Sequence, residues 1–192
     1  MTENLRRGKS APGRALTVAV LLVVGLAVIV GAQLLFRDSD QDPLEGGDAA
    51  LGNPAPRVTM EAFDGGQIVV PDDYEGTPLV LNFWASWCPF CIAEMPDFEK
   101  VHQDVEGTVA FLGVNLNDNR NAAEDLAHET HVTYPLAEDP RGVVYEAFGG
   151  TGMPTTVFID ADGNVADTIS GQIFEGQLRE MIARYFGVDA GA

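Results

Sequence analysis

The sequence predicts an α/β fold in which helices sandwich a mixed β-sheet. Strand-like and helix-like segments alternate from residue 79 to residue 148, and a β-hairpin and a final helix follow them. The run Leu79–Trp84 is almost continuously apolar, as is typical of a central strand covered on both faces. Residues 53–187 leave about 135 residues for this domain, which is enough chain for a core of its own.

A β-hairpin is predicted at the start of the domain. Two strand-like segments, 58–63 and 67–70, flank Asp64-Gly65-Gly66, which is a good turn signal. We therefore expect an N-terminal hairpin extension ahead of the central strand.

A helix is predicted over residues 90–105. Pro96 lies inside it and is expected to bend it, because proline removes a backbone hydrogen bond and clashes with the preceding turn. The apolar side chains are spaced for one helix face, and they are Ile92, Met95, Phe98, Val101 and Val105.

The remaining segments complete the alternation of strands and helices. We predict a buried strand at 109–115, an exposed helix at 122–131, a short strand at 134–137 and a short helix at 142–148. A second hairpin, 155–159 and 165–170, and an amphipathic helix, 174–186, close the domain, and 188–192 is a short tail.

The segment ahead of the domain predicts a membrane anchor. Residues 15–36 carry no charged side chain, and as a helix they would be about 33 Å long, enough to cross a bilayer core. The basic tail, 1–14, favours a cytoplasmic N-terminus and an extracytoplasmic domain. A cleaved signal peptide with a processing site at Val30-Gly31-Ala32 is the alternative. In either case the domain faces an oxidising compartment, in which disulfides persist.

Acidic residues dominate the composition. The chain has 29 Asp and Glu against 11 Lys and Arg, a formal net charge of −18. Residues 37–52 are predicted to be an acidic, flexible linker. A surface of this charge repels phosphate, so nucleic acid is excluded as a partner.

The two cysteines of the chain lie in Trp87-Cys88-Pro89-Phe90-Cys91, where the predicted central strand gives way to the predicted helix. A helix N-terminus has unpaired N–H groups and a partial positive charge, so a sulfur placed there ionises more easily. Pro89 suits the first helical position. We therefore expect Cys88 to be the nucleophile and the more buried Cys91 to resolve the mixed disulfide.

A structural disulfide and a zinc site are the alternatives for the cysteine pair. Zinc normally takes four ligands, and the chain has no second cysteine pair. The histidines His102, His128 and His131 offer no matching ligand set, although the last two are predicted to share a helix face. The segment 160–164 resembles a calcium loop, but its glycine comes too early. We predict no metal and no cofactor.

Several motifs along the domain carry a family resemblance. They are Ala55-Pro56, the hairpin after it, the run Asn82-Phe83-Trp84-Ala85-Ser86-Trp87-Cys88, Glu94-Met95-Pro96 and Gly152-Met153-Pro154-Thr155-Thr156. With them, residues 53–187 resemble the thioredoxin superfamily, and most closely its membrane-anchored TlpA/ResA branch, which includes the DsbE/CcmG-type proteins of cytochrome c maturation. The resemblance implies a thioredoxin-like fold.

The resemblance also implies an acid-base residue. In this branch an acid at the position of Glu94 sits beside the cysteines, where a partly buried carboxylate is able to accept the Cys91 proton. Thioredoxin carries a buried aspartate where this chain has Asn82, which cannot take a proton, and this difference favours Glu94. An exposed helical glutamate is the alternative.

The substrate-binding residues are implied in the same way. The segment before Thr155 resembles the loop that places a cis proline, here Pro154, opposite the active disulfide. The backbone of Met153 would then be open to an extended substrate strand. Trp87 is expected to form a site wall, whereas Trp84 is expected in the core.

The predicted function is that of an extracytoplasmic thiol-disulfide oxidoreductase. We favour a protein disulfide reductase that acts on apocytochrome c or other exported thiol proteins and exchanges electrons with a membrane-embedded redox partner. Proline stands first between the cysteines, as in the DsbA-type oxidant, so a disulfide-forming oxidase or isomerase is the alternative. A thiol peroxidase would have threonine and proline ahead of the reactive cysteine, but Ala85-Ser86-Trp87 precede Cys88, so we expect no peroxide turnover. A copper-binding module is the less favoured alternative, because the loop before Pro154 lacks the histidine that such a module would have.

Overall fold

The structure, a computed structural model, describes residues 51–191. The predicted basic tail, 1–14, and the predicted anchor, 15–36, lie outside these residues, as does the linker 37–52 except for its last two positions. Among residues 51–191 there is no helix with the length and hydropathy that a bilayer span requires.

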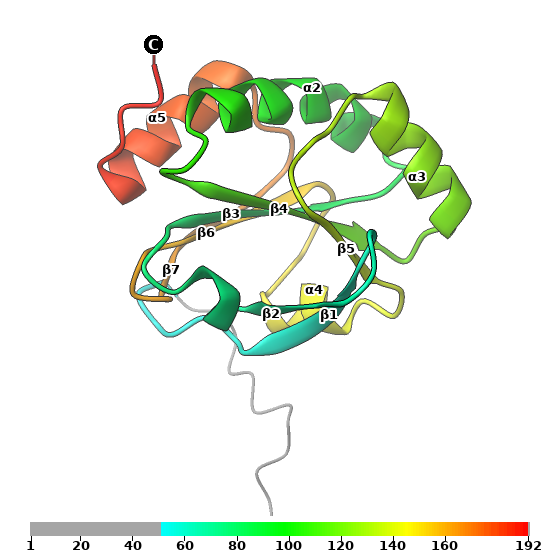
Figure 1. The fold of residues 1–192 in the computed structure, drawn as a ribbon, viewed down its shortest axis with the longest axis horizontal. Helices are drawn as coiled ribbons and strands as arrows, with labels where there is room; N and C mark the ends of the chain where they lie inside the picture. The colour runs from blue at the N-terminus through cyan, green and yellow to red at the C-terminus, as the bar shows by residue number, and fades with distance from the viewer. Residues whose placement is uncertain (1–50, 192) are drawn as a thin grey trace, which may run out of the picture. The chain divides into compact units, whose positions relative to one another are not determined.

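A mixed β-sheet forms the centre of the described domain (Figure 1). Within residues 51–191 it has seven strands in the order β2-β1-β5-β4-β3-β6-β7. The central strand β3 pairs parallel with β4 and antiparallel with β6, and β1 pairs antiparallel with β2. The strands are β1 (Val58–Ala62), β2 (Gln67–Val70), β3 (Leu79–Trp84), β4 (Ala110–Leu116), β5 (Leu136–Asp139), β6 (Thr155–Ile159) and β7 (Val165–Ser170).

Helices lie on both faces of the sheet, which confirms the predicted α/β class. Figure 1 shows α2 and α5 together on one face and α4 on the other. Arg179 of α5 forms an ion pair with Asp104 at the end of α2, at 2.5 Å. The helices are η1 (Asp72–Tyr74), which is a single 3₁₀ turn, α2 (Pro89–Asp104), α3 (Arg120–Glu129), α4 (Val143–Ala147) and α5 (Glu175–Phe186).

The central strand β3 is buried along its whole length, and its side chains alternate between the two faces of the sheet. Leu79, Leu81 and Phe83 belong to the core cluster that includes Val144 of α4. Val80 packs in the cluster on the opposite face, with side chains of α2 and α5. Even-numbered residues of β3 therefore face α2.

Helix α2 continues through Pro96, and its buried face differs from the predicted one. Ile92, which we expected on the apolar face, is 38% exposed. Successive helix residues are about 100° apart, and the buried face includes Cys91, Met95 and Phe98, which turns Ile92 toward solvent.

Two other predicted boundaries are corrected. The strand expected at 134–137 begins at Leu136, because Pro135 has no N–H for the ladder and Tyr134 is buried against the rings of His102 and Phe111.

The helix expected at 122–131 begins earlier, at Arg120, because the Asn119 side chain accepts hydrogen bonds from the backbone N–H groups of Asn121 and Ala122. His131 lies beyond its end with a positive φ of 59°, so the prediction that His128 and His131 share a helix face is wrong.

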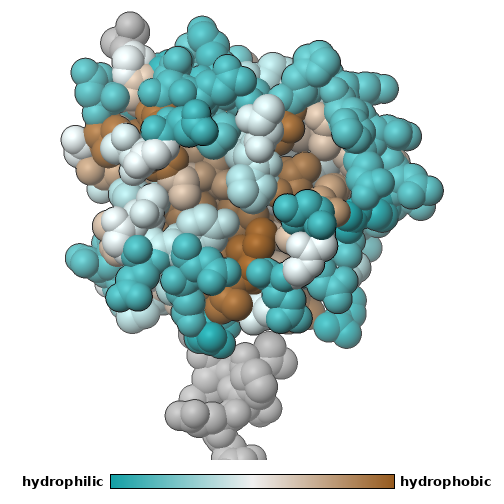
Figure 2. Space-filling model, viewed as in Figure 1, coloured by the Kyte–Doolittle hydropathy of each residue, from teal (hydrophilic) through white to brown (hydrophobic). Residues whose placement is uncertain are grey.

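Hydrophilic residues cover much of the face shown in Figure 2, with apolar residues visible between them. Such a surface accords with the large excess of acidic residues in the sequence.

Candidate active site

Three loops meet at one edge of the sheet. Strands β3 and β4 are parallel, so the loops that follow them leave from the same edge of the sheet. The paired residues Trp84 and Asn115 lie at this edge. Strand β6 is antiparallel to β3, so the loop that precedes β6 arrives at this edge too, where Phe83 pairs with Thr155. The site is built from these loops.

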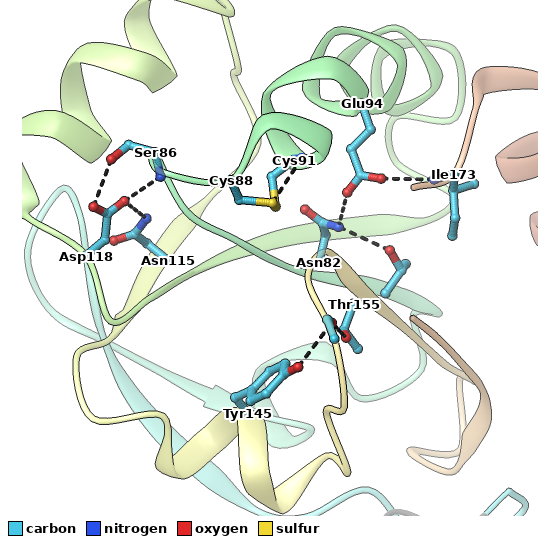
Figure 3. Close-up of a disulfide and its surroundings, with 12 residues drawn as sticks. Asn82, Ser86, Cys88, Cys91, Glu94, Asn115, Asp118, Tyr145, Thr155 and Ile173 are labelled. Atoms are coloured by element: carbon cyan, nitrogen blue, oxygen red, sulfur yellow. Dashed lines mark hydrogen bonds between the residues drawn. A yellow bond between two sulfur atoms is a disulfide. The ribbon is translucent and has the colours of Figure 1, made fainter. Parts of the chain in front are cut away.

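The cysteine pair lies at the N-terminus of α2, as predicted. Cys88 is the N-cap residue, Pro89 occupies the first helical turn, and Cys88 and Cys91 form a disulfide (Figure 3). The Cys88 sulfur accepts a hydrogen bond from the backbone N–H of Cys91 at 3.2 Å. Cys88 is 3% exposed and Cys91 is fully buried, so the expected difference in exposure is small.

The surroundings of the disulfide are apolar. Both cysteines pack in a cluster with Trp84, Met95 and Leu126, and Met153 lies against the same cluster. Trp84 is fully buried, in agreement with its predicted place in the core.

The two aromatic residues of the pentad lie on the surface beside the disulfide. Trp87 is 56% exposed and Phe90 is 62% exposed, so both offer apolar surface to a partner. The indole N–H of Trp87 donates to the carbonyl oxygen of Asn117 at 3.2 Å, which ties it to the loop after β4.

Asp118 anchors the loop that carries Cys88, and sequence reasoning missed it. Its carboxylate accepts hydrogen bonds from the backbone N–H of Ser86 at 2.5 Å, from the Ser86 hydroxyl at 2.8 Å and from Asn115 Nδ2 at 3.0 Å (Figure 3). Burial opposes ionisation, but these hydrogen bonds outweigh it and lower the pKa of Asp118. A polar run directly after β4 was the one available signal.

Glu94 is fully buried on the face of α2 that covers the sheet, which rules out the alternative of an exposed helical glutamate. Its carboxylate accepts hydrogen bonds from Asn82 Nδ2 at 2.9 Å and from the backbone N–H of Ile173 at 3.0 Å (Figure 3). Burial raises the pKa of Glu94 to about 7, although both hydrogen bonds act to lower it. Glu94 lies one helical turn after Cys91.

The loop before β6 contains a cis peptide bond between Met153 and Pro154, as the resemblance implied. The carbonyl oxygen of Gly152 accepts hydrogen bonds from the Tyr145 hydroxyl at 3.0 Å and from Thr155 Oγ1 at 2.5 Å. In the described part of the chain, the N–H and C=O groups of Met153 form no hydrogen bond. This backbone is therefore available to an extended peptide.

The candidate metal ligands of the sequence do not come together. In residues 51–191 no group of three or more His, Cys, Asp or Glu side chains is placed to hold a metal ion. The Asp160 carboxylate accepts hydrogen bonds from the backbone N–H groups of Asp162 and Asn164, so the segment 160–164 forms the turn of the β6–β7 hairpin.

A disulfide-bonded cysteine pair at a helix N-terminus, a buried carboxylate one turn further on and a cis-proline loop define a thiol-disulfide oxidoreductase with a thioredoxin-like fold. Residues 51–168 match the AhpC/TSA family, and the chain belongs to this family.

Named relatives define the type of enzyme more closely. The chain is 34% identical over 168 residues to the thiol:disulfide interchange protein DsbE of Pseudomonas fluorescens biotype C, with 86% of this chain and 93% of the relative covered. It is 29% identical over 168 residues to the thiol-disulfide oxidoreductase ResA of Oceanobacillus iheyensis, with 85% and 86% covered. A solved structure of MTB dsbF in mixed oxidised and reduced forms is similar, with a TM-score of 0.63 at 29% identity over 67% of this chain and 95% of that one. The protein is a thiol-disulfide oxidoreductase of the DsbE/ResA type.

Proposed function

We propose that this protein is an extracytoplasmic protein disulfide reductase. The observation that carries the proposal is the environment of the two sulfurs. A strongly oxidising pair owes its potential to a well-stabilised reduced thiolate. Here the helix N-terminus favours the Cys88 thiolate, but the apolar cluster around both sulfurs limits this stabilisation. The ionisable group one turn further along the helix is an acid, Glu94, which adds no positive charge beside the thiolate. These surroundings favour the disulfide form of the enzyme, and a stable enzyme disulfide makes its dithiol a good reductant.

The reaction follows from the placement of the two sulfurs. The Cys88 thiolate attacks a substrate disulfide, so that a mixed disulfide forms and one substrate thiolate leaves. Glu94 accepts the proton of Cys91, and the Cys91 thiolate then attacks the Cys88 sulfur. The enzyme disulfide forms, the second substrate thiolate leaves, and two electrons have passed to the substrate.

The substrate and its compartment are parts of the same proposal. The uncharged segment 15–36 and the basic tail before it support a single-pass anchor with a cytoplasmic N-terminus, and cleavage after export is the alternative. The substrates are exported thiol proteins, including apocytochrome c, as the resemblance to the DsbE/CcmG-type proteins supports. A membrane-embedded redox partner would return electrons to the enzyme disulfide.

The second candidate is an oxidase or isomerase that introduces disulfides into secreted proteins. The observation that favours it is Pro89, which stands first between the cysteines, as in the DsbA-type oxidant.

The reduction potential of the Cys88–Cys91 pair distinguishes the two functions. Titration of the full-length protein against glutathione is expected to give a potential near that of thioredoxin, about −270 mV. A potential near that of DsbA, about −120 mV, would contradict the reductase function and support the oxidase function.

A further inference from the structure

The side chain of Asn82 lies between the disulfide and Glu94. Asn82 is an even-numbered residue of β3, so it points toward α2, and it is 2% exposed. Its Nδ2 donates to Glu94 Oε1 at 2.9 Å and to Thr156 Oγ1 at 3.1 Å. Both amide hydrogens are therefore in use, which fixes the orientation of the amide.

The amide oxygen of Asn82 has no such partner. In the described part of the chain, Asn82 Oδ1 is a buried acceptor without a hydrogen bond. Figure 3 shows this oxygen on the side of the amide that faces the Cys88–Cys91 disulfide, with the nitrogen on the side of Glu94. A buried acceptor without a donor is unfavourable, so a hydrogen-bond donor placed beside Asn82 Oδ1 would stabilise the site.

Reduction of the disulfide supplies a donor. A disulfide sulfur carries no hydrogen, whereas a cysteine thiol has an S–H group that donates. Reduction to one thiol and one thiolate adds two electrons and one proton: the proton resides on the Cys91 sulfur, and the Cys88 sulfur carries the negative charge. Asn82 Oδ1 is the buried acceptor that faces this pair of sulfurs.

We propose that Asn82 is a positioning residue that accepts a hydrogen bond from the Cys91 thiol in the reduced protein only. This contact stabilises the dithiol relative to the disulfide. The contact also holds the Cys91 proton near Glu94, whose carboxylate accepts a hydrogen bond from Asn82 Nδ2. The Asn82 amide therefore aligns Cys91, the proton donor of the resolving step, with Glu94, its proton acceptor. The proposal concerns the exchange chemistry and holds whichever direction electrons flow.

A spectroscopic test isolates the thiol. The Cys88→Ser variant retains Cys91 as its single thiol, because the chain has two cysteines. We expect its infrared S–H stretching band below the frequency of a free thiol. Adding Asn82→Leu is expected to return the band to the free-thiol position. An S–H band at the free-thiol position with Asn82 present, or an unchanged low band with Asn82→Leu, would overturn the proposal.

The equilibrium test uses the full-length protein with both cysteines. We expect Asn82→Leu to shift the thiol-disulfide equilibrium with glutathione roughly fivefold toward the enzyme disulfide, the size expected for one lost hydrogen bond. Thr156→Val is the matched control, because it disturbs the same buried polar group and leaves Asn82 Oδ1 in place. Equal shifts for the two variants would reduce Asn82 to a structural role and contradict the proposal.

Discussion

Glu94 combines burial beside the resolving cysteine with a pKa of about 7. A free cysteine thiol has a pKa of about 8.5, so the proton affinity of this carboxylate is close enough to accept a thiol proton at neutral pH. An exposed glutamate with a pKa near 4.5 would be a much weaker base. Burial therefore suits Glu94 to general base catalysis.

At the residue scale we predict that Glu94→Gln slows the resolving step roughly a hundredfold, because a general base contributes about that much. The measurement is stopped-flow release of a peptide from its mixed disulfide with Cys88. The rate of the wild type should rise with pH through about 7, as Glu94 ionises, and the variant should lose this dependence.

The matched control is Glu180→Gln, which removes an exposed acid from α5 and should leave the rate unchanged. The same pH profile in Glu94→Gln and the wild type would remove Glu94 from the proton transfer. The alkylation rate of Cys88 should be similar in all three proteins, because Cys88 ionises before Glu94 acts.

At the scale of the elements, the short helix α4 positions the substrate loop. Tyr145 packs edge-to-face against Phe83 of the central strand, with ring centroids 5.3 Å apart, and its hydroxyl donates to the Gly152 carbonyl. A Cβ at Gly150 would lie 2.1 Å from the Tyr145 ring, so any other residue at this point would displace the ring. The cis-proline loop is thereby tied to the core through one side chain.

We predict that Tyr145→Phe raises the KM for a disulfide-containing peptide severalfold, because one hydrogen bond of about 1 kcal/mol that holds the loop is lost. The kcat should change little, since no reacting atom is touched. Tyr185→Phe is the control, because its hydroxyl bonds Asp167, away from the loop. An unchanged KM in Tyr145→Phe would show that the loop keeps its position without this contact.

The elements nearest the cysteines were predictable because their signals are local. The apolar run Leu79–Trp84 and the proline at the start of α2 identify the strand and the helix without knowledge of the rest of the chain. The burial of Glu94 does not follow from the local sequence, because it depends on the backbone of Ile173, which lies 79 residues away. Asp118 and the contacts of Asn82 were missed for the same reason, since their partners come from other loops and strands.

At the scale of the whole molecule, the fold raises the pKa of a buried acid, so that Glu94 is about half protonated at pH 7. Glu94 lies on the buried face of α2 and accepts a hydrogen bond from the chain before α5. Ionisation of this buried carboxyl group therefore lowers the unfolding free energy of the entire domain. The pKa of Glu94 is raised to about 7 in the folded state, against about 4.5 in an unfolded chain. The folded protein therefore binds more protons than the unfolded protein between these two values.

We predict that the unfolding free energy of the oxidised wild type, relative to that of Glu94→Gln, falls by about 3 kcal/mol as the pH rises from about 4.5 to about 7. The stabilisation is fully present below pH 4.5, where Glu94 is protonated in both states. Urea unfolding of both proteins across this range measures the difference. A difference that stays constant with pH would mean that Glu94 titrates normally in the folded protein.

The most direct test of the central claim is the pH dependence of the alkylation of Cys88 in the Cys91→Ser variant. Because Cys88 caps the N-terminus of α2, its thiol is expected to ionise below the free-cysteine pKa of about 8.5. Ionisation at or above the free-cysteine value would contradict the claim that the helix N-terminus activates this sulfur.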